Sequence, residues 1–146
     1  MKTIATVFGI GYIPKIPGTL GSAVGLGIAW LLSANPIQQG IGCLVAIGLA
    51  LWSAGPTAKE LGSRDPHAIV IDEVAGMMVG VFLLPAAGKV YLAAFLLFRL
   101  LDVTKPLGIR KLERLPGSWG ILLDDLAAGL ATNLLLRLGL GVAGRG

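Results

Sequence analysis

Five of the eight acidic residues in this chain lie inside or against strongly apolar segments, and this constrains the fold more than any other feature. They are Asp72 and Glu73 in AIVIDEVAGMMVG, Asp102 in FLLFRLLDVTKP, and Asp124 and Asp125 in GILLDDLAAG. A carboxylate at the centre of a membrane helix costs about 2.5–3.5 kcal/mol, so such residues usually bind an ion, carry a proton or take part in chemistry. A single carboxylate near a helix end can simply reach the membrane surface. Three separate acidic clusters favour one shared site.

The composition predicts a polytopic membrane protein with a single domain over residues 1–146. The chain is 55% hydrophobic and only 14% charged, whereas soluble domains have about 25% charged residues. The net charge of +4 does not indicate a nucleic-acid partner, because the basic residues flank apolar runs. The lone Cys43 excludes an intrachain disulfide and a cysteine-cluster metal site. Without an A-x-A-like cleavage pattern after the N-terminal residues, we expect no cleaved signal peptide.

Five apolar segments, separated by proline, glycine and charged residues, predict the secondary structure. They run from about Thr19 to Ala34, Ile37 to Ala58, Ala68 to Leu84, Val90 to Thr104, and Trp119 to Val142. Their apolar residues are continuous rather than alternating, and a membrane span must satisfy its own backbone hydrogen bonds, which favours helices over a barrel. We therefore predict an all-α fold, a small membrane bundle of about four to five apolar helices. Some segments are shorter than the roughly 20 residues of a full span.

The distribution of lysine and arginine predicts the orientation of this bundle. Basic residues concentrate in the N-terminal tail, the second connection and the fourth connection. They are Lys2, Lys15, Lys59, Arg64, Lys105, Arg110, Lys111 and Arg114. The first connection has no charge and the third has only Lys89. Because basic connections stay in the cytoplasm, all five carboxylates are expected at the cytoplasmic ends of their helices.

The segment PGTLGS at the start of the first apolar run predicts an anion site. Thr19 is expected to cap the helix, with Ser22 one turn inside. The free N–H groups and the dipole at a helix start attract anions. A Gly-Thr helix start is usually no more than that, but here it accompanies a carboxylate site. Carboxylates beside an anion site imply a bridging cation, and Mg²⁺ with a phosphate is the common case.

Arg99, Asp102 and Lys105 are spaced three residues apart, which predicts that they share one helix face. Two interpretations stay open and can both hold. In one, the three form a ladder of ion pairs that makes Asp102 tolerable near lipid. In the other, Arg99 and Lys105 bind a substrate phosphate while Asp102 binds metal.

The adjacent acids of each pair diverge by about 100° around a helix, so one of each pair should point into the bundle. Asp72 and Asp125 are the inner candidates. Gly76 and Gly129 follow them by four residues and would let another helix or a headgroup come close.

Four blocks of this sequence resemble the phosphatidylglycerophosphatase A family: FGIGYIPKIPGTLGS, DPHAIVIDEVAGMM, FRLLDVTKP and GSWGILLDDLAAG. They occur in the family's order over about residues 8–129. The resemblance implies a small all-helical, Mg²⁺-dependent enzyme of the bacterial cytoplasmic membrane, with its active site facing the cytoplasm. It implies hydrolysis of the phospholipid phosphatidylglycerophosphate to phosphatidylglycerol and phosphate. By matching position, the catalytic and metal-binding residues would be Asp72, Glu73, Asp102, Asp124 and Asp125. The phosphate-binding residues would be Thr19, Ser22, Arg99 and Lys105.

Two positions lie outside this pattern. Gly108 stands where the family often has a second proline, and His67 matches no motif position and is interpreted as a loop residue.

Cys-x5-Arg and DxDx[TV] phosphatase patterns are absent, which favours a metal-activated water, with a covalent aspartyl-phosphate still open. The main alternative from another class is an intramembrane cation or proton transporter, although its acids should lie near the midplane. A lipid-headgroup phosphotransferase would carry a DGxxAR-type signature, which is missing. A non-catalytic assembly subunit would not need so many buried acids.

Overall fold

The computed structural model of this protein describes residues 1–63, 66–106 and 108–143, without the side chains of residues 110, 113 and 142. All regular structure in this part of the chain is helical, which confirms the predicted all-α class. The elements are α1 (Lys2–Ala5), η1 (Ile10–Tyr12), α2 (Pro17–Leu32), α3 (Pro36–Glu60), α4 (Ile71–Gly80), α5 (Gly88–Thr104), η2 (Ile109–Arg114) and α6 (Ser118–Ala143). The helices α2 to α6 correspond to the five apolar segments. The short helices α1, η1 and η2 were not predicted.

The start of α2 differs from the prediction. The helix begins at Pro17, and Ile16 occupies the N-cap position without a side-chain hydrogen bond. Thr19 is therefore the third residue of the helix rather than its cap. Proline suits the first helical position, because its fixed φ is helical and its missing N–H would have no partner there. Asn35, in contrast, caps α3: its Oδ1 accepts hydrogen bonds from the N–H of Ile37 at 2.9 Å and of Gln38 at 3.3 Å.

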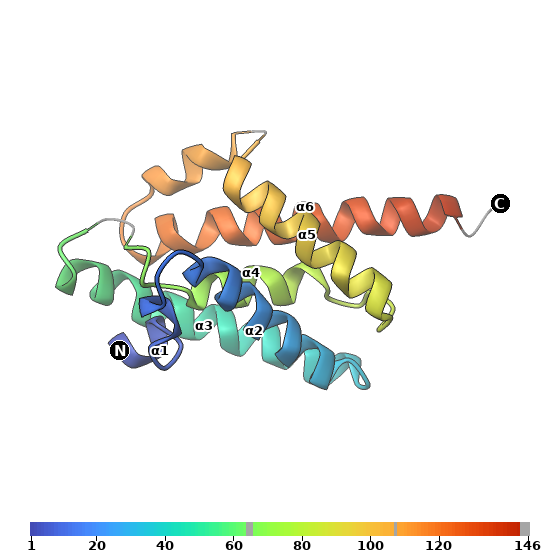
Figure 1. Ribbon diagram of the computed structural model, residues 1–146, viewed down its shortest axis with the longest axis horizontal. Coiled ribbons are helices and arrows are strands. Elements are labelled where there is room, and N and C mark those ends of the chain that lie inside the picture. Colours follow the sequence, from blue (N-terminus) through green and yellow to red (C-terminus); the bar gives the residue numbers. More distant parts are fainter. Residues whose placement is uncertain (64–65, 107, 144–146) are drawn as a thin grey trace.

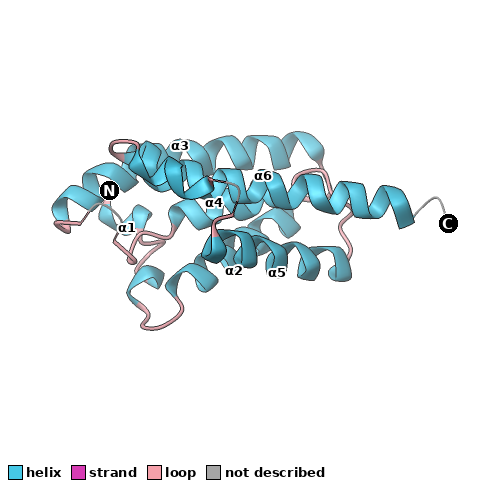
Figure 2. Ribbon diagram, turned by 90° about the horizontal axis from the view of Figure 1, so that it is seen from above, coloured by secondary structure: helices cyan, strands magenta, loops and turns pink. Residues whose placement is uncertain are grey.

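Helix α4 lies at the centre of the bundle and contacts α2, α3, α5 and α6 (Figures 1 and 2). It is shorter than the predicted segment. All of its residues are buried except Glu73 and Val79, which are half-buried. Glycines let its neighbours approach. A Cβ at Gly21 of α2 would lie 2.9 Å from the Val70 carbonyl oxygen, and one at Gly25 would lie 2.6 Å from that of Val74. The central position of α4 is thus set by small residues on the surrounding helices.

Many small side chains lie in the interior of the bundle, beside larger ones such as Phe98 and Met77, and many large apolar side chains lie on its exterior. Each of the helices α2 to α6 carries at least one buried alanine; examples are Ala29, Ala50, Ala54, Ala75, Ala94 and Ala128. Leu31, Leu44 and Leu138 are 81%, 70% and 68% exposed. Small residues between helices and large apolar residues outside are typical of membrane bundles. Among the described residues, one helix, α3, is long and apolar enough to cross a membrane, by length and composition alone, and α2 is a shorter apolar helix.

The connections alternate between the two ends of the bundle. In Figure 1 the N-terminus, the α3–α4 connection and the η2 connection lie toward the left, whereas the α2–α3 and α4–α5 connections lie toward the right. The three basic connections of the sequence therefore share one end of the molecule. The N-terminal end of α4 and the C-terminal end of α5 lie toward this same end.

The N-terminal residues hold the segment that leads into α4. The N–H of Val70 donates to the Ala5 carbonyl of α1 at 2.9 Å. Gly9 adopts a left-handed φ of 93°, and a Cβ at Gly11 would collide with the carbonyl oxygen of Ala68. These two glycines explain part of the FGIG motif: a larger residue at Gly9 would be strained in the left-handed conformation, and one at Gly11 would collide with the segment that leads into α4.

Candidate metal and phosphate site

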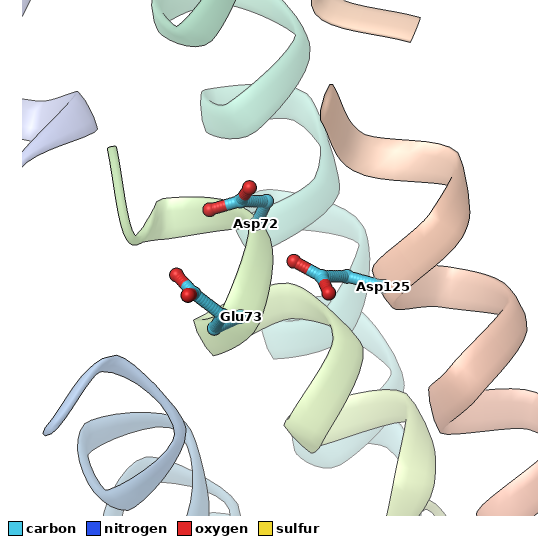
Figure 3. A group of neighbouring side chains, drawn as sticks. All are labelled: Asp72, Glu73 and Asp125. Atoms are coloured by element: carbon cyan, nitrogen blue, oxygen red, sulfur yellow. The ribbon is translucent and has the colours of Figure 1, made fainter. Parts of the chain in front are cut away.

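Three carboxylates converge at the N-terminal end of α4. Asp72 and Glu73 lie in the first turn of α4, where the helix dipole favours negative charge. Asp125 reaches them from α6, and each residue offers an oxygen within 4.8 Å of the other two. In Figure 3 the Asp125 side chain points from α6 toward the first turn of α4, which carries Asp72 and Glu73. Asp72 and Asp125 are 6% and 3% exposed, so these like charges lie close together with little solvent.

Two glycines determine this convergence. A Cβ at Gly76 would lie 2.6 Å from the backbone carbonyl oxygen of Asp125, and one at Gly129 would collide with the carbonyl oxygen of Gly76. The backbones of α4 and α6 are therefore in direct contact one turn beyond the acids. This agrees with the predicted close approach at Gly76 and Gly129.

The other two acids are paired with cations. Arg99 of α5 donates to Asp102 one turn later, and Lys105 donates to Asp124 of α6. The expectation that Lys105 shares a helix face with Arg99 and Asp102 is wrong. Helix α5 ends at Thr104, and Lys105 turns into a left-handed conformation with φ 45° and ψ 56°. Pro106 disfavours a helical residue before it, so Lys105 turns toward α6.

The first turn of α2 closes one side of the cluster. A Cβ at Gly18 would collide with Oε1 of Glu73 and would lie 3.2 Å from Nη1 of Arg99. A larger residue at this position would displace the ends of both side chains. Ser22 is fully buried, and its hydroxyl donates to the Gly18 carbonyl at 2.8 Å. The Ser22 hydroxyl is thus engaged within α2 and does not line the pocket, whereas Thr19 does.

These residues surround a pocket of about 330 Å³. Every residue predicted for the site lines it except Ser22: Thr19, Asp72, Glu73, Arg99, Asp102, Lys105, Asp124 and Asp125. Lys15 and His67 also line the pocket, and sequence reasoning had not assigned either to the site. His67 lies in the loop before α4, as interpreted from the sequence. Lys15 lies within the block FGIGYIPKIPGTLGS, two residues before PGTLGS, but the resemblance assigned it no role.

The residues present fit a metal ion. Carboxylate oxygens are the ligands that hard divalent cations prefer, and Asp72, Glu73 and Asp125 supply three carboxylates within reach of one ion. Oε2 of Glu73 is buried and has no hydrogen-bond partner among the described residues. A cation between these groups would offset their mutual repulsion and supply the missing partner.

Comparison with known proteins identifies the family of this chain. The sequence model of the family described as phosphatidylglycerophosphatase A matches residues 3–140. This chain belongs to the phosphatidylglycerophosphatase A family. A protein of Escherichia coli K12 named phosphatidylglycerophosphatase A is 35% identical over 91% of this chain and 79% of its own length. One of Haemophilus influenzae with the same name is 34% identical over 87% of this chain and 80% of its own length.

A third relative carries another name. A Bacteroides thetaiotaomicron protein named "Putative phosphatidylinositol-3-phosphatase" is 33% identical over 97% of this chain and 94% of its own length. No solved structure matches this member of the phosphatidylglycerophosphatase A family.

Proposed function

We propose that this chain hydrolyses the phosphomonoester of phosphatidylglycerophosphate, releasing phosphatidylglycerol and inorganic phosphate during phospholipid synthesis. The observation that carries the proposal is the convergence of Asp72, Glu73 and Asp125 beside two cation–carboxylate pairs, in a chain of the phosphatidylglycerophosphatase A family. The names of all three relatives describe a phosphatase that acts on a phospholipid headgroup. The two names that agree with the family favour phosphatidylglycerophosphate over a phosphoinositide.

The cation we propose is Mg²⁺, held by Asp72, Glu73 and Asp125. When bound, Mg²⁺ offsets negative charge on phosphoryl oxygens and makes a water molecule more acidic, both of which favour attack on a phosphate ester. An all-carboxylate set suits Mg²⁺ better than a softer metal.

The other pocket residues would bind and orient the phosphate. Arg99 and Lys105 bring positive charge to the pocket, and their ion pairs with Asp102 and Asp124 restrict their orientation. The hydroxyl of Thr19 and the free N–H groups in the first turn of α2 can donate to phosphoryl oxygens. A carboxylate oxygen of the pocket would accept the proton of the attacking water.

We place the bundle in the bacterial cytoplasmic membrane with several helices embedded and the pocket facing the cytoplasm. The large exposed leucines on α2, α3, α5 and α6 support a lipid-facing surface. The basic connections lie at the same end of the bundle as the pocket, and basic connections stay in the cytoplasm. A pocket there would meet a lipid phosphate made on the cytoplasmic side.

Phosphate release from phosphatidylglycerophosphate by the purified protein, with and without chelator, tests the function. We expect EDTA to abolish release and excess Mg²⁺ to restore it, because the acids otherwise repel each other and the substrate. Full turnover in excess EDTA would rule out the metal. A transporter would instead move cations into proteoliposomes and release no phosphate.

Cysteine labelling tests the orientation. In a Cys43→Ala background, Ser63→Cys lies in the α3–α4 connection and Gly88→Cys at the start of α5, and both positions are exposed. An impermeant maleimide added outside intact cells should label position 88 and not position 63. The reverse pattern would overturn the orientation.

A further inference from the structure

The mouth of the pocket carries a lysine for which the mechanism above has no role. Lys15 lines the pocket, is exposed, and stands two residues before α2. Its φ is 76°, in the left-handed region that residues other than glycine rarely adopt. Such a conformation persists only where the surrounding chain imposes it, and it is common at ligand sites. Pro14 directly precedes Lys15, and Pro17 follows after Ile16, so the backbone is restricted on both sides of the segment Lys15-Ile16.

The charge of Lys15 is available to a ligand. Arg99 and Lys105 of the same pocket are engaged with Asp102 and Asp124. Lys15 has no ion pair with a carboxylate in the part of the chain that the structure describes. It is therefore a positive charge at the mouth of a pocket whose floor is acidic.

The mouth also has an apolar side. Ile16 and Val103 both line the pocket, and they are 49% and 67% exposed. Leu100 and Leu96 continue from Val103 along one face of α5, 58% and 60% exposed. Helices α2 and α5 lie side by side in Figures 1 and 2. The pocket thus combines buried carboxylates with an exposed lysine and exposed apolar side chains, which fits a ligand with a charged head and an apolar tail.

We infer that Lys15 binds the phosphodiester of the lipid substrate and selects headgroups that carry a second phosphate, an assignment that rests on the phosphatase function proposed above. With the phosphomonoester at the carboxylate floor and the acyl chains over Ile16 and Val103, the phosphodiester must lie between them. Lys15 is adjacent to Ile16 in the chain and lines the same pocket, which supports placing it beside the phosphodiester. A lysine ammonium is a strong partner for a phosphate oxygen.

Inhibition kinetics separate this contact from the rest of the site. The product phosphatidylglycerol carries the phosphodiester without the phosphomonoester, whereas inorganic phosphate resembles only the leaving group. In Lys15→Gln we expect the KM for phosphatidylglycerophosphate and the Ki for phosphatidylglycerol to rise together by about tenfold, as the loss of one charge-assisted hydrogen bond implies. The Ki for inorganic phosphate should stay within about twofold of wild type, since that ion binds at the floor.

Two further variants serve as controls. Lys15→Arg keeps the charge and should restore most of the phosphatidylglycerol inhibition. Lys111→Gln removes the same charge from an exposed lysine of η2 that does not line the pocket, and should change neither inhibition constant. Equal changes in both inhibition constants for Lys15→Gln, or no change in either, would overturn the inference. A wild type that releases no phosphate from the lipid would refute the proposed function instead.

Discussion

The two ends of α4 both meet buried polar side chains, but they use them differently. At the C-terminal end, Nδ2 of Asn133 donates to the carbonyls of Val79, Gly80 and Phe82 at 3.3, 3.2 and 2.8 Å. Arg137 donates to Oδ1 of Asn133 at 2.7 Å. At the N-terminal end, three carboxylates crowd together, and Oε2 of Glu73 has no hydrogen-bond partner among the described residues.

This difference separates structural polar groups from functional ones. The last carbonyls of a helix have no partner within the helix, and Asn133 supplies donors to those of α4. Buried polar groups that serve the fold are normally satisfied in this way. Carboxylates that face one another destabilise the fold without a ligand, so their retention indicates a binding role. We therefore expect substitutions at the N-terminal end to change activity, and those at the C-terminal end to change stability.

The largest effect on activity is expected from Asp125→Asn. The substitution removes one carboxylate of the cluster with almost no change in shape, and phosphate release should fall by about a hundredfold or more. The midpoint of thermal unfolding without metal should stay equal or rise, because one of the crowded charges is gone. Phosphate release and thermal unfolding of the same preparation check both parts.

Glu60→Gln is the matched control for Asp125→Asn. Glu60 is an exposed acid at the end of α3 and does not line the pocket, so its neutralisation should leave both activity and stability near wild type. Near-normal phosphate release by Asp125→Asn would contradict a functional role for the acids at the N-terminal end of α4.

Gly76→Ala should lower both the stability of the protein and its activity. Its Cβ would lie 2.6 Å from the Asp125 carbonyl oxygen, so α6 must move away from α4. Overpacking of this kind costs about 1–3 kcal/mol, and the displacement of Asp125 should lower kcat by about tenfold or more. Gly48→Ala is the control, because its Cβ meets nothing within 4 Å and should stabilise α3 slightly. Unchanged activity in Gly76→Ala would show that the acids tolerate a wider α4–α6 separation.

Much of the N-terminal end could be predicted from the sequence. A carboxylate inside an apolar segment is rare enough to mark its own position, and the basic connections placed all five acids at one end. The close approach at Gly76 was also predictable, since a glycine one turn from a buried acid lets another helix come near. The pairing of Lys105 with Asp124 was not, because a residue before proline leaves the helix and its direction depends on tertiary contacts.

The C-terminal end of α4 could not be predicted. Asn133 and Arg137 lie in the apolar run ATNLLLRLGL, four residues apart, with nothing nearby in sequence to show what they contact. Apart from the hydrogen bond that joins Arg137 to Asn133, their partners are backbone carbonyls more than fifty residues away, and a backbone carbonyl leaves no signal in the sequence. Lys15 was missed for a related reason: it lies within a family-like block, but its place at the pocket follows from the conformation of the chain before α2.

Asn133→Leu should lower stability by about 2 kcal/mol, because buried carbonyls of the α4 C-terminus lose their donor. Activity per folded molecule should stay within about twofold of wild type, since Asn133 lies far along α6 from the pocket. Chemical unfolding in mild detergent measures the first effect, and phosphate release measures the second. The control is Leu134→Ala at the exposed neighbouring position, where the loss should be smaller. A specific loss of kcat in Asn133→Leu would show that the two ends are coupled.

Arg137→Met should give the smallest effect. Arg137 donates to Asn133 and, through Nη2, to the Phe82 carbonyl at 2.9 Å, but its side chain is exposed, so water replaces both hydrogen bonds. Methionine keeps much of the apolar stem, and we expect a loss below about 1 kcal/mol.

The double variant Asn133→Leu/Arg137→Met tests whether the two residues act together. In Asn133→Leu, Arg137 has already lost one acceptor. The stability loss of the double variant should therefore be smaller than the sum of the two single-variant losses, by about 0.5 kcal/mol or more. Strict additivity would mean that Asn133 holds the end of α4 without help from Arg137. A loss near 3 kcal/mol for Arg137→Met alone would mean that the arginine is the main donor there, and the division of roles at this end would have to be reversed.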